Sequence, residues 1–344
     1  MWNLLFDLRP KTSRSDLFNR ERELRELDRA VSRGYPLTLV LGIRRIGKTS
    51  LVKAFLEKYR GVYIDARGVS RRSELYERIG DGLYSSLSRT RRLLEGIRGI
   101  SIAAAGVEVR WRGSDSISFT GLLQEINKKG ERFVLAIDEI QALRPPLSAE
   151  LRSLVAYSYD NFENISIVVS GSEVGLLRSF LGVDDASSPL YGRYAHEVHV
   201  ERFAKDLSKE FLIKGFREEG LKLREEAIDE ATELFDGIVG WLVFFGRTYA
   251  DGVRDIGKIS SMAVNLALDE LNKLSPREKL ILKAMAEDAK SWSEVRSFVS
   301  ERKGVVLPKS TVTRIIDKLE MMSIVKDYEF LDPIYRRACK KLKL

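Results

Sequence analysis

The stretch LTLVLGIRRIGKTSLVKAF, residues 37–55, restricts the possible folds of this chain more than any other. Four of its first five residues are apolar and predict a buried strand, and its last residues have the apolar spacing of a helix. Between them, residues 42–49 match G-x-x-x-x-G-K-[ST] at every fixed position. Turns of this kind point successive backbone N–H groups at an anion, beside the positive end of the following helix. The stretch therefore predicts a phosphate-binding loop in an α/β protein.

Two residues of this loop have expected chemical roles. Lys48 is expected to reach the β- and γ-phosphates of a nucleotide, and the Thr49 hydroxyl to ligate Mg²⁺. The alternative is a chance match in a basic surface turn, but the flanking strand and helix are the context that the motif requires. The other predicted nucleotide-binding residues of the loop are Gly42, Ile43, Arg44, Arg45, Ile46, Gly47 and Ser50.

A second apolar strand is followed by two adjacent carboxylates in RFVLAIDEIQAL, residues 132–143. Open α/β sheets bind ligands at the carboxyl ends of their strands, where Asp138 and Glu139 are expected to lie. Asp138 is expected to hold the Mg²⁺ shell, and Glu139 to act as general base toward the attacking water. The alternative is that both acids cap the next helix near its positive end. The phosphate-binding loop in the same chain favours the catalytic interpretation.

Two further residues are candidates for contact with the γ-phosphate. The strand ISIVVSGSEVGLL, residues 165–177, ends in serines, of which Ser172 is the favoured candidate; alternatively, these serines only begin the next turn. Arg193 follows a glycine in SPLYGRYAHEVHV, residues 188–200. An arginine that reaches the γ-phosphate, from its own or a neighbouring subunit, accelerates turnover by about 10³–10⁵. A lone arginine is otherwise a surface residue.

The sequence after Leu274 predicts three short helices and a two-stranded wing, which together make a winged helix-turn-helix. Residues 270–344 hold 17 lysines and arginines against 11 acids, so +6 of the net charge of +8 lies there. This charge favours DNA as a partner, whereas a protein-interaction or packing module is the alternative. The DNA-binding candidates on the third helix are Lys309, Ser310, Thr311, Thr313, Arg314 and Lys318.

The predicted organisation is a P-loop core over residues 1–200, a helical lid over 201–268 and the winged helix over 269–344. The chain has 344 residues, 44% of them hydrophobic and 31% charged, which is typical of a globular protein. It contains one cysteine, Cys339, so no internal disulfide is possible and we expect a cytoplasmic protein. No stretch has 18 uninterrupted apolar residues, so we expect no membrane partner.

The motifs together resemble one family. The stretches FDLRPKTSRSDLFNREREL, GIRRIGKTSL, LAIDEIQ, VSGSEVGLL and PLYGR, with the winged helix, are similar to the archaeal ATPase family. This family belongs to the signal-transducing (STAND) branch of AAA+-type P-loop NTPases and is related to origin-recognition initiators. The resemblance covers nearly the whole chain and implies an AAA+-like parallel sheet, a helical lid and a C-terminal winged helix.

The resemblance also implies site residues. FNRE resembles the family's F-x-G-R-E box beside the adenine, which makes Phe18, Asn19, Arg20 and Glu21 base-side candidates, with Asn19 in place of the usual glycine. Arg193 matches the family's G-R. In the lid, GIVGW stands where the family often has G-x-P. The resemblance implies ATP as the nucleotide, with Mg²⁺, and no guanine-reading N-K-x-D stretch appears.

The favoured function is an ATP-binding and ATP-hydrolysing switch whose nucleotide state controls the winged helix. A P-loop kinase is an alternative, but no second motif for a phosphoryl acceptor is present, and the acidic pair favours water as acceptor. A DNA-binding regulator that keeps nucleotide only for structure is a third hypothesis, which the intact Lys48, Thr49, Asp138 and Glu139 disfavour. Oligomerisation is left open, because Arg193 could act within its own subunit or across an interface.

Overall fold

The computed structural model describes residues 4–103, 106–111 and 116–342. Its centre is a sheet in the order β2–β5–β6–β1–β7, in which every neighbouring pair of strands is parallel. The predicted P-loop sheet fold is thus confirmed. The strands are β1 (Leu37–Leu41), β2 (Gly61–Asp65), β5 (Phe133–Asp138), β6 (Ile165–Gly171) and β7 (His196–His199).

Helices cover both faces of this sheet, which explains why its strands are continuously apolar rather than alternating. Successive side chains of a strand point to opposite faces. Val40 of β1 accordingly packs in one core with α1 and α2, while Leu39 and Leu41 pack in the other. The helices of this domain are α1 (Glu21–Ser32), α2 (Lys48–Leu56), α3 (Arg72–Ser85), α4 (Leu87–Leu94), α5 (Phe119–Lys128), α6 (Leu147–Asn161) and α7 (Val174–Leu181).

A hairpin is present near residues 99–113, where the alternating, glycine-containing stretch GISIAAAGVEVRWRG predicts one. Strands β3 (Ile100–Ala103) and β4 (Gly106–Val109) pair antiparallel in a separate two-stranded sheet, and β4 packs against α3. Residues 104–105 and 112–113 of the predicted hairpin lie outside the described residues.

A helical lid and the winged helix form the C-terminal half, and they share one apolar core. This core also receives Phe6 of the N-terminal segment, whose ring lies against Gly215 and Gly246. The lid helices are α8 (Lys205–Glu218), α9 (Glu225–Phe235), α10 (Val239–Ala250) and α11 (Ile256–Leu271). The winged helix comprises α12 (Pro276–Ala286), α13 (Trp292–Lys303), α14 (Lys309–Met321), β8 (Val325–Lys326), β9 (Glu329–Phe330) and α15 (Pro333–Lys340).

The wing is shorter than the sequence pattern indicates. The alternating stretch 324–338 gives two strands of two residues each, and the chain then turns into α15. Asp332 caps this helix by accepting a 2.8 Å hydrogen bond from the Ile334 N–H, and Pro333 occupies its first position. Asp-Pro is a helix-start signal that outweighs the alternation.

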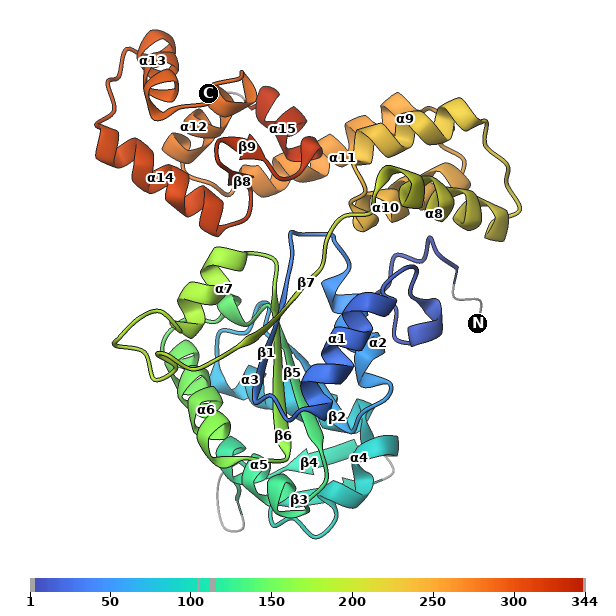
Figure 1. Ribbon diagram of the computed structural model, residues 1–344, viewed down its shortest axis with the longest axis vertical. Helices are drawn as coiled ribbons and strands as arrows, with labels where there is room; N and C mark the ends of the chain where they lie inside the picture. The colour runs from blue at the N-terminus through green and yellow to red at the C-terminus, as the bar shows by residue number, and fades with distance from the viewer. Residues whose placement is uncertain (1–3, 104–105, 112–115, 343–344) are drawn as a thin grey trace.

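The lid and the winged helix lie together above one end of the sheet (Figure 1). This is the end at which β1 leads into the phosphate-binding loop and β5 ends in Asp138. The two halves therefore meet where the sequence places its candidate site. Within the described part of the chain, no helix has the length and apolarity needed to span a membrane.

Candidate active site

The phosphate-binding loop connects β1 to α2 and depends on its two motif glycines. A side chain at Gly42 would meet the Val200 carbonyl oxygen at 2.6 Å, so only glycine fits this close approach. Gly47 has a φ of 100°, in the left-handed region that favours glycine. Helix α2 starts directly afterwards at Lys48, so its N-terminal N–H groups border the loop.

Lys48 is buried and reaches back over the loop. Its Nζ donates hydrogen bonds to the carbonyl oxygens of Gly42 at 2.7 Å and Ile43 at 2.8 Å. Burial lowers the pKa of Lys48 to about 8, while the charges of Glu139 and Asp138 act in the opposite direction. Neutral carbonyls are weaker partners for an ammonium group than an anion is. The lysine is therefore positioned to exchange them for a phosphate oxygen.

Asp138 at the end of β5 is fully buried and accepts hydrogen bonds from hydroxyl groups on three elements. Thr49 Oγ1 donates to Oδ2 at 2.6 Å, Tyr63 donates to the same oxygen at 2.8 Å, and Ser170 donates to Oδ1. Burial, and then the charge of Asp138, raise the pKa of Tyr63, so this phenol stays a donor. A carboxylate and a hydroxyl in contact form the hard oxygen set that suits Mg²⁺. The residues present thus fit the metal that the motif implies.

Glu139 has a left-handed backbone, with a φ of 52°, which is uncommon for a residue other than glycine. Its carboxylate Oε2 accepts hydrogen bonds from Ser172 Oγ at 3.1 Å, the Ser172 N–H at 3.3 Å and Gln141 Nε2 at 2.6 Å. Gln141 approaches closely because Gly171 has no side chain: a Cβ there would lie 2.4 Å from its Oε1. The candidate base is therefore held by two neighbours. Ser172 is within the site, as predicted, but its observed partner is Glu139.

A cavity of about 510 Å³ lies in front of these residues. The phosphate-binding loop, Glu139 and Ser172 line one side of it, and the N-terminal segment 7–10, the start of α10 and Glu270 line the other. A smaller adjoining cavity, of about 80 Å³, is lined by Phe18, Arg20, Phe203, Phe211 and Val243 among others. The phosphate-binding loop forms part of the wall of the larger cavity, which makes this cavity the candidate site for the phosphates.

The four residues that the resemblance places beside the base differ in whether they line a cavity. Phe18 and Arg20 line the smaller cavity, and Arg20 also donates to the carbonyl oxygens of Ile46 at 3.1 Å and Glu201 at 3.0 Å. Asn19 has a φ of 49°, a conformation that asparagine tolerates better than most residues and that explains its replacement of a glycine. Glu21 is the exposed first residue of α1 and lines neither cavity.

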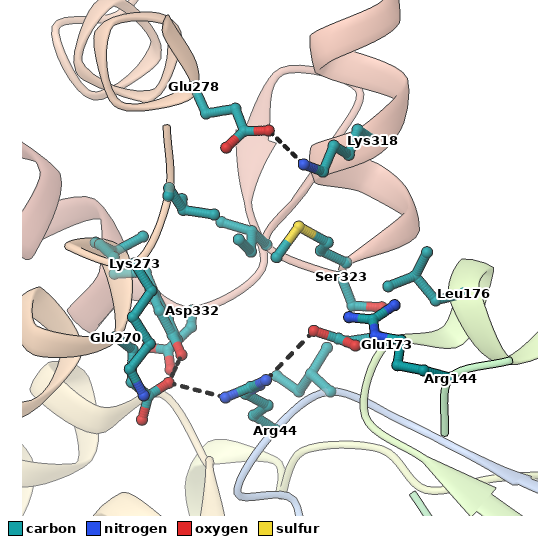
Figure 2. Close-up of a pocket in the computed structure, with 16 residues that line it drawn as sticks. Arg44, Arg144, Glu173, Leu176, Glu270, Lys273, Glu278, Lys318, Ser323 and Asp332 are labelled. Atoms are coloured by element: carbon teal, nitrogen blue, oxygen red, sulfur yellow. Dashed lines mark hydrogen bonds and ion pairs between the residues drawn. The ribbon is translucent and has the colours of Figure 1, made fainter. Parts of the chain in front are cut away.

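The two loop arginines point toward the C-terminal half of the chain. Arg44 lies between Glu173 at 3.3 Å and Glu270 at 3.2 Å (Figure 2). Arg45 forms an ion pair with Glu270 and stacks over the Trp241 ring, with its guanidinium carbon 4.0 Å from the ring centre. Both arginines therefore pair with Glu270 of the lid helix α11, and Arg45 also contacts Trp241 of α10.

The lid helix α10 also contacts the loop through its backbone. The Gly240 N–H donates a 2.7 Å hydrogen bond to the Arg45 carbonyl oxygen. A Cβ at Gly240 would lie 2.7 Å from the Arg45 Cβ, so the helix approaches this closely only with a glycine. The stretch GIVGW, which differs from the family pattern, thus places its second glycine directly on the phosphate-binding loop.

Arg193 lies away from the site of its own chain. It forms a bidentate ion pair with Asp160 near the end of α6, at 2.7 and 3.0 Å. It precedes β7, whose first residue, His196, pairs with Thr38 near the beginning of β1. Because the phosphate-binding loop follows the other end of β1, Arg193 is at the opposite edge of the sheet. A role for Arg193 in its own site would therefore need a large movement.

Five of the six DNA-binding candidates lie on the N-terminal part of α14. Lys309, Ser310, Thr313 and Arg314 are exposed and Thr311 is half-buried, with the Lys309 ammonium 4.8 Å from the Trp292 ring centre. Lys318 instead pairs with Glu278 at 2.6 Å in the cavity between α14, α11 and the ATPase domain (Figure 2). The C-terminal end of α14 rests on α7, where a Cβ at Gly175 would meet Met321 at 2.5 Å.

Sequence reasoning missed four residues that the structure adds to the site: Tyr63, Gln141, Trp241 and Glu270. Each contacts a predicted site residue. For Tyr63, Trp241 and Glu270 the pairing depends on the order of the strands or on the position of the lid, whereas Gln141 contacts its near neighbour Glu139. Gln141 had a visible signal, because it lies two residues after Glu139 in LAIDEIQ. The other three had none in their local sequence.

The comparisons with known proteins agree with this geometry. A family model of ATPase domains, described as predominantly from Archaea, matches residues 17–245, and a model of the MCM protein C-terminal winged helix-turn-helix domain matches residues 272–336. No curated protein matches the chain. The solved structure of the Walker-type ATPase PABY2304 of Pyrococcus abyssi is 38% identical, with a TM-score of 0.83, and the match covers 98% of this chain and 100% of that one.

Two more distant structures show weaker similarity. Cdc6p from Pyrobaculum aerophilum is 17% identical, with a TM-score of 0.49 and coverage of 94% of this chain and 90% of that one. The Orc1 protein of Aeropyrum pernix, solved in complex with DNA, is 17% identical with a TM-score of 0.42, covering 90% and 85%. Neither is similar enough to bear on the function of this chain.

The fold and the site together define a Walker-type P-loop ATPase with a C-terminal winged helix. The chain belongs to the family of ATPase domains found predominantly in Archaea. The resemblance noted in the sequence is thus confirmed at the level of the family.

Proposed function

We propose that this protein is an ATP-hydrolysing switch in which the state of the phosphate-binding loop controls the position of the winged helix. One observation carries this proposal: an ion pair and a hydrogen bond join the phosphate-binding loop directly to the lid helices α11 and α10. Arg45 pairs with Glu270, and the same carboxylate accepts a hydrogen bond from Tyr335 of α15. Two side-chain contacts, Arg45 with Glu270 and Glu270 with Tyr335, therefore link the phosphate-binding loop to the winged helix.

A second contact strengthens this link. Trp241, over which Arg45 stacks, donates a 2.8 Å hydrogen bond from Nε1 to Asp332, the residue that caps α15. Burial raises the pKa of Asp332 and outweighs the hydrogen bonds from Trp241 and the Ile334 N–H, which act to lower it. Arg45 thus reaches α15 along two routes, one polar and one aromatic.

In the proposed hydrolysis, each site residue has one task. Lys48 and the N–H groups of the loop bind the phosphates, Thr49 and Asp138 hold Mg²⁺, and Glu139 orients the attacking water and accepts its proton. When bound, Mg²⁺ supplies positive charge against the charge that develops on the phosphoryl oxygens. Ser172 and Gln141 keep the Glu139 carboxylate in place through their hydrogen bonds.

Coupling follows from competition for the loop arginines. Phosphate is a bidentate partner for a guanidinium group, as a carboxylate is. When Arg44 or Arg45 turns toward phosphate, Glu270 loses a partner and its hold on Tyr335 changes. A ligand shifts a conformational equilibrium only through such a difference in contacts between two states. The expected consequence is an ATP-dependent movement of residues 272–336 relative to the ATPase domain.

The proposal is tested by hydrogen–deuterium exchange of α14 and α15 in the full chain, with and without ATP and Mg²⁺. ATP is expected to change the exchange of both helices in the native protein and in Glu139→Gln, but not in Lys48→Ala. The proposal fails if Lys48→Ala shows the same ATP-dependent change. Duplex DNA binding, measured in the same states, then shows whether the controlled activity of the winged helix is DNA binding.

A protein partner of the winged helix is the second candidate. Val305 and Val306, in the connection before α14, are 51% and 58% exposed. Adjacent exposed apolar side chains are more typical of a protein contact than of a phosphate contact. Val305→Ser with Val306→Ser is expected to leave DNA binding unchanged and to weaken a protein complex, which separates the two candidates.

A further inference from the structure

A groove of about 660 Å³ opens at the edge of the sheet opposite the phosphate-binding loop. Three separate elements form it: the connection before β2, the residue before β5, and helix α4. The described residues that line it include six cations and no acid; the cations are Lys58, Arg60, Arg89, Arg91, Arg92 and Arg132. Sequence reasoning gave this surface no role.

Helix α4 contributes half of this charge through three arginines. The helix buries the side chains of Thr90, Leu93 and Leu94. Those of Arg89, Arg91 and Arg92 are exposed. The helix has no acid in its first turn, and Glu95 after it neutralises only one of the three arginines, Arg91, at 2.9 Å.

The remaining cations are only partly neutralised. Lys58 pairs with Asp28, and Arg60 with Glu131, while Arg132 donates to the Glu163 carbonyl oxygen at 2.6 Å. Within the described residues, Arg89 and Arg92 form no ion pair. Converging like charges raise the free energy of the folded protein unless a counter-ion joins them. The groove therefore favours a polyanion.

The chemistry of the groove identifies the kind of polyanion. A surface that binds anionic membranes combines basic residues with apolar side chains that insert, and none of the described lining residues is an exposed apolar one. Single-stranded nucleic acid stacks its bases on exposed aromatic rings. The aromatic residue here, Tyr59, is half-buried and donates its hydroxyl to Asp28 at 3.0 Å. Cations on rigid elements suit the backbone of a duplex, which offers regularly spaced phosphates.

We propose that this groove binds the sugar-phosphate backbone of double-stranded DNA, independently of its sequence. The site is distinct from the winged helix, which lies beyond the other edge of the sheet (Figure 1). If the winged helix also binds DNA, the protein has two separate surfaces for the duplex. If the winged helix binds a protein, the groove on the ATPase domain is the DNA-binding surface. The inference does not depend on the proposed switch, because no groove residue contacts the nucleotide cavity.

The test measures binding of the full chain to a labelled 30-base-pair duplex of arbitrary sequence across a salt series. Arg89→Glu with Arg92→Glu changes the groove, and both side chains are exposed, so the fold is expected to persist. The matched control is Arg22→Glu with Arg25→Glu on exposed positions of α1, which alters the net charge equally. The groove variant and the control variant both also carry Lys309→Ala and Arg314→Ala, which remove the two positive charges at the N-terminal part of α14.

In that background, the groove variant is expected to bind at least about tenfold more weakly than the control at 150 mM salt. Its plot of log affinity against log salt should be shallower by about 2, because each phosphate contact contributes about 0.9. The inference is overturned if the two variants weaken binding equally. It is also overturned if the Lys309/Arg314 background binds no duplex at 50 mM salt, or if the groove binds phosphatidylserine vesicles or polyglutamate in preference to duplex.

Discussion

The two edges of the central sheet differ in how their charges are balanced. At the phosphate-binding edge the charged groups have partners inside the protein: Arg44 and Arg45 bind Glu173 and Glu270, and Asp138 receives three hydroxyl groups. At the opposite edge, six cations line a groove with no lining acid among the described residues. Three of them pair with acids outside the groove, and Arg89, Arg92 and Arg132 form no ion pair within the described residues. A balanced edge can take up a ligand only by exchanging internal partners, which couples binding to movement. An unbalanced edge takes up a ligand without such an exchange.

The largest expected effect is at the balanced edge. Glu139→Gln should lower the rate of ATP hydrolysis by about 10²–10⁴, because the amide cannot accept a proton. ATP binding should persist, since Lys48 and the loop are unchanged. Steady-state phosphate release and equilibrium nucleotide binding measure the two quantities. Equal loss of ATP binding and ATP hydrolysis would show that Glu139 has a structural role. The control variant is Glu150→Gln, at an exposed position of α6.

Glu270→Gln probes the exchange of partners. Glutamine keeps one acceptor oxygen but removes the negative charge and the second oxygen that Arg44, Arg45 and Tyr335 share. The free energy of unfolding should therefore fall by about 1–2 kcal/mol. This estimate allows for the half-exposed side chain of Arg44. The control variant is Glu226→Gln, at an exposed position of α9, which should change the free energy of unfolding by less than about 0.5 kcal/mol. Urea denaturation compares the variants, and equal stability would mean that the link to the winged helix carries no energy.

The stability difference between native protein and Glu270→Gln should depend on pH. Burial raises the pKa of Glu270, but the hydroxyl of Tyr335 and the charge of Arg45 outweigh it, so the pKa lies below its ordinary value of 4.5. A carboxyl whose pKa is lower in the folded state stabilises the protein above the unfolded pKa and loses this contribution as pH falls through the folded value. The difference should therefore be constant from pH 7 to 5 and shrink below 4.5. A constant difference down to pH 3 would contradict the ion pair.

The smallest effect is expected at the unbalanced edge. Arg89→Ala with Arg92→Ala should leave ATP hydrolysis within about twofold and stability within about 0.5 kcal/mol, since neither side chain has an ion pair to lose. A slight stabilisation is the expected direction, because two repelling charges disappear. A clear fall in hydrolysis would break the comparison, because it would show that the two edges communicate. Phosphate release and thermal unfolding at low salt are the measurements.

Particular residues show how far the sequence reached. Gly42 to Thr49 and the Asp138–Glu139 pair were predictable because short motifs carry their own geometry: a glycine-rich turn between a strand and a helix, and acids at the end of a buried strand. The winged helix was predictable from its apolar spacing, apart from α15. Arg193 was not, because a G-R pair has no geometry of its own, and its position at the far edge depends on how β7 pairs with β1.

The sequence by itself therefore determined the phosphate-binding loop, since Gly42 to Thr49 act through neighbours at most seven positions away, and it predicted the two acids at the end of a buried strand. Tertiary structure alone decided what the loop arginines contact, because Glu270 is 225 residues from Arg45 and reaches it only after the lid folds over the sheet. It likewise assembled the basic groove from α4 and the starts of two strands. Long-range contacts of this kind depend on strand order and helix packing, and no local pattern encodes either.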